Sequence, residues 1–264
     1  MTWEPDSKAL AFFSDCAGTS GQLDIYLSHL DGAPARQLTA LKGYVHEAAF
    51  SPDGSKIAFL YVEGATRPAG ALAAMKPPSG VIGEDNIEVQ RVAYADVAAS
   101  APTAATIATP ANLHAYEFDW SPDSKGFAYI AADPPGENNW WVAKLYTQTL
   151  DSQTPKAVLA PAEVSGSLHG LQIAVPRWSP DGKALAFIGG LMSDQGSTGG
   201  DVWIVPSAGG QPRNLTEGRP TSPAWVEWSG NDYLFVSELA GGNAQLIRLH
   251  LQGDRTGEGA VTFG

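Results

Sequence analysis

An aromatic residue followed by a proline-containing turn recurs along this chain, and it constrains the fold more than any other feature. The phrase reads Trp3-Glu4-Pro5-Asp6-Ser7-Lys8, Phe50-Ser51-Pro52-Asp53-Gly54-Ser55-Lys56, Trp120-Ser121-Pro122-Asp123-Ser124-Lys125 and Trp178-Ser179-Pro180-Asp181-Gly182-Lys183, with a weaker copy at Trp228-Ser229-Gly230-Asn231-Asp232. We call the five leading residues the signature aromatics. They stand 47, 70, 58 and 50 residues apart, which is typical of propeller blades with insertions of variable length.

Each unit predicts four strands. The first ends at the signature aromatic, and the turn after it has residues suited to it: proline presets φ, aspartate bonds back to the turn, and glycine takes the positive-φ position. A second strand with small/large alternation then begins, at 9–12, 57–60, 127–130 and 184–187. We expect a third strand at 24–27, 86–89, 144–146, 201–205 and 245–249, and a fourth at 36–39, 213–216 and 260–263.

The predicted fold class is therefore all-β, with no convincing helix. We expect one domain over 1–264, a β-propeller of five four-stranded antiparallel blades with WD-like repeats, at about 1–40, 41–109, 110–164, 165–217 and 218–264. A lone four-stranded sheet cannot bury both faces, whereas sheets stacked around an axis can. A flat sandwich is the less favoured alternative. The long insertions all fall on one face of the expected disc, where loops usually contact ligands or partners.

Composition excludes several classes of partner and site. A net charge of −12 argues against nucleic-acid and anionic-membrane partners. One cysteine allows neither an internal disulfide nor a cysteine-based zinc site. No apolar run reaches the ~20 residues of a membrane span, and no signal segment is present, so the sequence leaves a cytoplasmic and a periplasmic location open. The first residues open in the middle of a repeat, so we expect the natural protein to extend further N-terminally.

The repeats resemble the blades of TolB-like proteins and of the prolyl oligopeptidase family of serine peptidases. Three segments look most like the acylaminoacyl-peptidase branch: 119–129, 140–146 and 187–201. The resemblance implies a non-catalytic propeller that caps an α/β-hydrolase domain and restricts which peptides reach its active serine. The expected partners are that hydrolase domain and peptide substrates.

The chain departs from this family pattern in two ways. It has five repeats where such peptidases typically have seven, and no serine lies in a Gly-x-Ser-x-Gly elbow. We therefore expect a fragment of a larger propeller with no catalytic residues of its own. Because a cut arc exposes unpaired strand edges, we also expect ring closure or homodimerisation. A TolB-like protein-binding scaffold and a propeller enzyme such as a polysaccharide lyase are the alternatives.

Three groups of residues are candidates for contact with a ligand or partner. His46, Glu47 and Arg177 precede signature aromatics on innermost strands and are expected at the central channel, either holding a ligand or hydrating the channel. The run Asn138-Asn139-Trp140-Trp141 suits stacking on a ligand, although in a strand the two rings would face opposite sides. Asp194 lies in a polar glycine-rich loop, interpreted as a domain contact. No cofactor is predicted, and the five scattered histidines do not predict a metal site.

Overall fold

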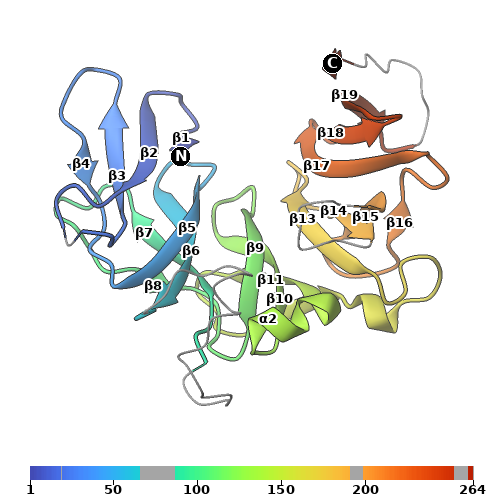
Figure 1. Ribbon diagram of the computed structural model, residues 1–264, viewed down its shortest axis with the longest axis horizontal. Coiled ribbons are helices and arrows are strands. Elements are labelled where there is room, and N and C mark those ends of the chain that lie inside the picture. The colour runs from blue at the N-terminus through green and yellow to red at the C-terminus, as the bar shows by residue number, and fades with distance from the viewer. Residues whose placement is uncertain (19, 66–86, 191–198, 253–260, 264) are drawn as a thin grey trace.

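A computed structural model describes residues 1–18, 20–65, 87–190, 199–252 and 261–263. The chain forms five antiparallel sheets of four strands, and in each sheet the strands pair in chain order. This confirms the predicted all-β architecture. In Figure 1 the sheets fan out in an arc, with the first sheet in blue at one end and the last in red at the other.

The strands have the following bounds. Blade 1 contains β1 (Thr2–Trp3), β2 (Ala9–Ser14), β3 (Asp24–His29) and β4 (Arg36–Gln37). Blade 2 contains β5 (Gly43–Phe50), β6 (Lys56–Glu63), β7 (Arg91–Asp96) and β8 (Thr106–Ile107). Blade 3 contains β9 (His114–Trp120), β10 (Gly126–Ala132), β11 (Lys144–Thr149) and β12 (Lys156–Leu159). Blade 4 contains β13 (Gln172–Trp178), β14 (Ala184–Gly190), β15 (Asp201–Pro206) and β16 (Arg213–Asn214). Blade 5 contains β17 (Thr221–Ser229), β18 (Tyr233–Ala240), β19 (Asn243–His250) and β20 (Val261–Phe263).

Helical structure is confined to three short segments among the described residues. The helix α2 (Gly136–Asn139) and the 3-10 turn η1 (Trp140–Val142) connect β10 to β11, and the 3-10 turn η2 (Pro161–Glu163) connects β12 to β13. No helix in this part of the chain is long and apolar enough to cross a lipid bilayer.

The third strand of blade 2 is displaced from its expected position. The sequence predicts it at 86–89, but β7 covers Arg91–Asp96 and pairs with β6 through registers such as Phe59↔Ala93. The strand is the run that buries Val92, Ala93 and Ala95. Burial of 91–96 against β6 therefore outweighs the β propensity of the expected segment, 86–89, that precedes it in the sequence.

The turns after the signature aromatics have the predicted chemistry. In blade 2, Asp53 Oδ1 accepts hydrogen bonds from Ser51 Oγ (2.7 Å) and from the Ser55 backbone N–H (2.9 Å). Positive φ occurs at Gly54 (72°) and, in the corresponding turn of blade 3, at Ser124 (61°). The Asp53 backbone N–H also donates to Ser124 Oγ (3.0 Å), so these turns contact one another from blade to blade.

The core lies between the blades. The four buried apolar clusters each combine side chains of two consecutive blades, for example Ala58 and Leu60 of β6 with Trp120 and Tyr129 of blade 3. We call the face that packs on the preceding blade the leading face, and the opposite one the trailing face. The signature aromatics belong to the leading faces. The sheets of blades 2, 3 and 4 are therefore each packed on both faces by neighbouring blades, as radial stacking requires.

The arc is open. No strand pairing joins blade 1 to blade 5 among the described residues, and Figure 1 shows the two blades on opposite sides of an opening. The expected ring closure is therefore not the arrangement that this structure adopts, and homodimerisation stays a prediction.

Candidate functional site

The innermost strands surround a central space that we call the lumen. A cavity of about 460 Å³ lies there, and β5, β9, β13 and β17 all contribute to its wall. Side chains of a strand alternate between its two faces. The signature aromatics lie on the leading faces, so the residues one position before them lie on the trailing faces of the innermost strands, beside the lumen. The lining residues are Glu47, Ala48, Ala49, Glu117, Phe118, Asp119, Val175, Arg177, Trp225 and Glu227.

Each of these four inner strands is interrupted by a register shift of the kind a β-bulge produces. In β5 and β13 the shift includes a non-glycine residue with positive φ, Glu47 at 51° and Val175 at 55°. Such a conformation costs of the order of 1 kcal/mol or more for a side-chain-bearing residue. A bulge re-aims the side chains around it, and here it does so at the wall of the cavity.

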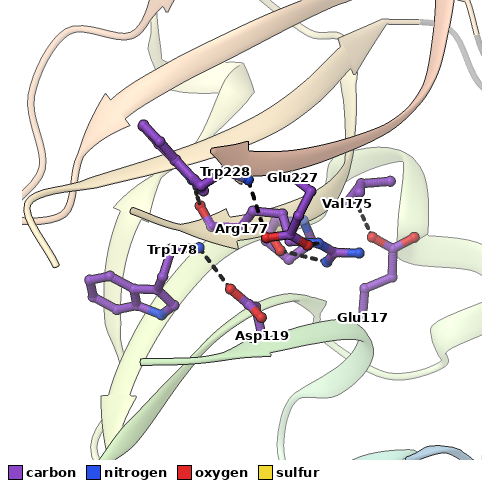
Figure 2. A network of polar contacts seen from close by, with 8 residues as sticks. Glu117, Asp119, Val175, Arg177, Trp178, Glu227 and Trp228 are labelled. Atoms are coloured by element: carbon purple, nitrogen blue, oxygen red, sulfur yellow. Dashed lines mark hydrogen bonds and ion pairs between the residues drawn. The ribbon is translucent and has the colours of Figure 1, made fainter. Parts of the chain in front are cut away.

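Carboxylates link the inner strands of blades 3 and 4 (Figure 2). Glu117 Oε2 accepts a hydrogen bond from the backbone N–H of Val175, and Asp119 Oδ2 accepts one from that of Trp178 at 2.7 Å. Both carboxylates come from β9 and both N–H groups from β13, which do not pair as strands. The two side chains therefore join neighbouring blades directly at the lumen.

Arg177 is the only cationic residue among those that line the cavity. Its Nε lies 3.3 Å from Glu227 Oε2 of β17, and this ion pair links blade 4 to blade 5 (Figure 2). The backbone carbonyl of Arg177 also accepts a hydrogen bond from the Trp228 indole at 3.0 Å. With four carboxylates against one guanidinium, the lining is acidic.

Burial changes the protonation of these carboxylates. Desolvation raises the pKa of Glu117 to about 7, although the Val175 N–H and Arg177 act in the opposite direction. It raises the pKa of Asp119 to about 7 as well, against the Trp178 N–H and Arg177. The pKa of Glu47 is also raised by desolvation, with Arg177 opposing. Perturbed carboxyls gathered in a cavity are a frequent property of functional sites.

Two of the three residues predicted at the channel line the cavity, and one does not. Glu47 and Arg177 line the cavity, while His46 does not. A ring nitrogen of His46, Nε2, lies 2.8 Å from Oε1 of Gln90, the residue directly before β7, and burial lowers the pKa of the histidine. Contact of any of these residues with a ligand stays a prediction.

The tryptophan pair lies elsewhere and has a different local structure from the one expected. Trp140 and Trp141 belong to the 3-10 turn η1 and not to a strand, so their rings lie together, with centroids 4.4 Å apart, and do not face opposite sides of a sheet. Trp141 is 49% exposed. Asn139 Nδ2 donates to the Asp133 carbonyl, and Asn138 contributes backbone to α2. Asp194 lies outside the described residues.

Sequence reasoning missed Glu117, Asp119, Glu227 and Trp225. The signal was present, because these residues occupy the same positions before their signature aromatics, three and one, as Glu47 and Arg177 do before theirs. No group of three or more histidine, cysteine or acidic side chains in the described residues is placed to hold a metal ion.

The cavity and its strands define a β-propeller with an acidic lumen, and comparison with known structures supports this class. The chain superposes on a protein assigned as TolB from Agrobacterium tumefaciens (TM-score 0.62, 17% identity, 99% of this chain and 78% of that one). It also superposes on an oligogalacturonate lyase in complex with manganese (0.65, 16%, 95% and 61%) and on a puromycin hydrolase (0.61, 17%, 97% and 38%). At these identities the likeness concerns the fold.

Sequence comparison adds a peptidase. The chain is 34% identical over 88 residues to the uncharacterized peptidase YuxL of Bacillus subtilis (strain 168), a match that spans 32% of this chain and 13% of that protein. No protein-family profile matches the chain. The chain is thus a propeller that resembles both TolB and the propellers of prolyl-oligopeptidase-type peptidases.

Proposed function

We propose that this chain is the substrate-gating propeller of a prolyl-oligopeptidase-type serine peptidase and works beside an α/β-hydrolase domain. The observation that carries the proposal is the lumen cavity, which is walled by side chains from four inner strands. The short sequence match to a peptidase and the fold shared with a puromycin hydrolase support it.

The gating itself needs no bond chemistry. A cavity of about 460 Å³ admits a few residues of extended peptide but no folded protein. Because four carboxyl groups and one arginine line it, the lumen favours cationic over anionic groups, and most strongly above about pH 7, where Glu117 and Asp119 are ionised. Trp225, which is 38% exposed, adds an aromatic surface for a side chain or peptide plane.

The same charges bear on the lyase alternative. Oligogalacturonate is a polyanion, and a lining with an excess of carboxylates opposes its entry. For the TolB-like alternative, the exposed Trp141 and Val142, 49% and 62% accessible, offer an apolar patch of the kind that protein partners cover. That scaffold function is the second candidate.

The test is to obstruct the lumen. Ala49 lines the cavity and borders the core between blades 2 and 3, so Ala49→Trp places an indole at the cavity wall, and circular dichroism checks that the variant folds. A synthetic tripeptide with a free amino terminus should bind the wild-type chain, detected by tryptophan fluorescence or calorimetry, and should bind Ala49→Trp at least about tenfold more weakly. Leu30→Trp is the matched control, because Leu30 is 68% exposed and does not line the cavity.

Two results contradict the proposal. One is peptide binding that Ala49→Trp leaves unchanged. The other is hydrolysis of aminoacyl or acyl-peptide reporter substrates by the purified chain itself, because a gating propeller has no nucleophile for that reaction.

A further inference from the structure

Two carboxyl groups of the lumen wall can change charge without losing the contacts that hold them. Glu117 Oε2 accepts a hydrogen bond from the Val175 backbone N–H of the next blade. Asp119 Oδ2 accepts one from the Trp178 backbone N–H of the same blade. A protonated carboxyl keeps a carbonyl oxygen that can accept such a bond. A proton gained or lost therefore alters the charge of the cavity wall and leaves an acceptor for each bridging N–H.

The charged groups that face these two carboxyls come from the other three inner strands. Arg177 of β13 favours the ionised form of both. Glu47 of β5 disfavours ionisation of Glu117, and Glu227 of β17 disfavours that of Asp119. Figure 2 shows Glu117, Asp119 and Glu227 around the Arg177 side chain. Because the guanidinium also pairs with Glu227 at 3.3 Å, its charge is shared among several carboxyls.

Desolvation outweighs the attraction of the guanidinium and holds the pKa of both Glu117 and Asp119 at about 7. Below this pH both are mostly neutral, and at most two carboxylates of the wall, Glu47 and Glu227, oppose the charge of Arg177. Above it, four carboxylates oppose the same single cation. The wall of a cavity of about 460 Å³ thus becomes much more negative over a narrow range of pH.

The wall also contains two groups suited to a ligand's cation. Among the described residues, no hydrogen bond or ion pair engages the Glu47 carboxylate, which lies at the bulge of β5. Trp225 of β17 lines the same cavity and is 38% exposed. An aromatic ring packs against the alkyl part of a lysine or arginine side chain and attracts its charged end. The cavity therefore combines carboxylates with an aromatic surface.

We propose that the lumen is a proton-regulated site for cationic side chains: it binds the ammonium or guanidinium group of a peptide when Glu117 and Asp119 are ionised, and releases it when they are protonated. This inference rests on the proposed gating function, because it requires that peptides enter the lumen. Glu47 provides the attraction that remains at lower pH. By linkage, binding of the cation in turn releases protons from the wall.

The experiment measures the affinity of the purified chain for two peptides from pH 5.5 to pH 8, at constant ionic strength, by titration calorimetry. The first is acetyl-Ala-Lys-Ala-amide, which keeps its charge over this range because the pKa of lysine is about 10.4. The second has norleucine in place of lysine and is neutral. The lysine peptide should bind at least about tenfold more tightly at pH 8 than at pH 5.5, and the norleucine peptide equally at both.

Two variants assign the effect to residues. The double variant Glu117→Gln with Asp119→Asn keeps an acceptor for each bridging N–H but carries no charge there. At pH 8 it should bind the lysine peptide about as weakly as wild type does at pH 5.5. Glu217→Gln is the matched control, because Glu217 is exposed and does not line the cavity, and it should keep the wild-type pH dependence. Circular dichroism checks that both variants fold.

Proton release gives a measurement that needs no variant. Binding of the lysine peptide to wild type near pH 6.5, measured in two buffers of different ionisation enthalpy, should release between about one and two protons. Binding of the norleucine peptide should release none.

The outcomes separate this inference from the gating function. The inference alone is overturned if the norleucine peptide binds and Ala49→Trp weakens it, while the lysine peptide binds equally at pH 5.5 and pH 8. It is also overturned if the double variant keeps the wild-type pH dependence, or if both peptides show the same dependence. If neither peptide binds at any pH, the gating function is overturned with it.

Discussion

Replacing Glu117 by glutamine and Asp119 by asparagine together should remove most of the pH dependence of stability between pH 5 and 8. In the unfolded chain these carboxyls lose their protons near pKa 4.5 and 3.8, whereas in the folded chain both pKa values are about 7. Between those limits the folded state binds protons that the unfolded state releases. The free energy of unfolding therefore falls as the pH rises from about 4 through about 7, and this fall ends about one pH unit above the folded-state pKa values.

The size of the effect follows from the pKa values. Moving the pKa of Asp119 from 3.8 to about 7 corresponds to at most about 4 kcal/mol, and the change at Glu117 to at most about 3 kcal/mol. Both side chains are half-buried and line the cavity, so solvent screening reduces these values. We therefore expect about 2–4 kcal/mol in total, lost by the wild type between pH 5 and 8.

The amides keep an acceptor oxygen for the N–H groups of Val175 and Trp178 but carry no charge. At pH 8 the double variant should be more stable than wild type, and it should lose most of the fall in stability that wild type shows from pH 5 to 8. His46 has a lowered pKa and contributes the opposite slope in both proteins, so it cancels in the difference. Urea unfolding followed by tryptophan fluorescence at pH 5, 6, 7 and 8 measures the effect.

Glu217→Gln is the matched control, because Glu217 is exposed and does not line the cavity. Its pH profile should follow that of wild type. The reasoning is refuted if wild type is as stable at pH 8 as at pH 5, or if the double variant keeps the wild-type slope.

Three further changes test the packing between and within blades by urea unfolding at pH 7. Glu238→Ala removes a fully buried carboxylate that pairs with Arg219 at 2.8 Å, and it should cost about 3–5 kcal/mol, so a loss below about 1 kcal/mol would contradict this account. Trp120→Phe deletes the indole bond to the Ala49 carbonyl and should cost about 1–2 kcal/mol, and an unchanged midpoint would show that this bond does not stabilise the blade contact. Gly182→Ala places a methyl group at φ 72° and should cost about 1 kcal/mol, an expectation that a stabilised variant would overturn.

The fold was largely predictable because each repeat contains the turn residues that mark where its strands begin and end. The Pro-Asp turns bound the first and second strands, and the alternation after them gives the buried faces. The third strand of blade 2 was misplaced because two apolar runs lie close together, and only pairing with β6 selects Arg91–Asp96. The helical turn at Trp140 and Trp141 was missed because no periodicity can develop in so short a segment.

The site was only partly predictable. Glu47 and Arg177 were found because each precedes a signature aromatic, but the same count applied to every repeat also yields Glu117, Asp119 and Glu227. What the sequence does not contain is the partner of each group. The bonds of Glu117 and Asp119 to backbone N–H groups of the next blade join residues 58 and 59 positions apart.

The alternation along the inner strands has an evolutionary consequence. One set of positions, the signature aromatics, holds the blades together and stays aromatic in all five units, whereas the residue just before each one is Thr2, Ala49, Asp119, Arg177 or Glu227. Mutations at the second set alter the interior wall while leaving the aromatic side chains of the core between the blades in place. A lineage, or a protein engineer, can thus diversify what this wall recognises without rebuilding the architecture that supports it.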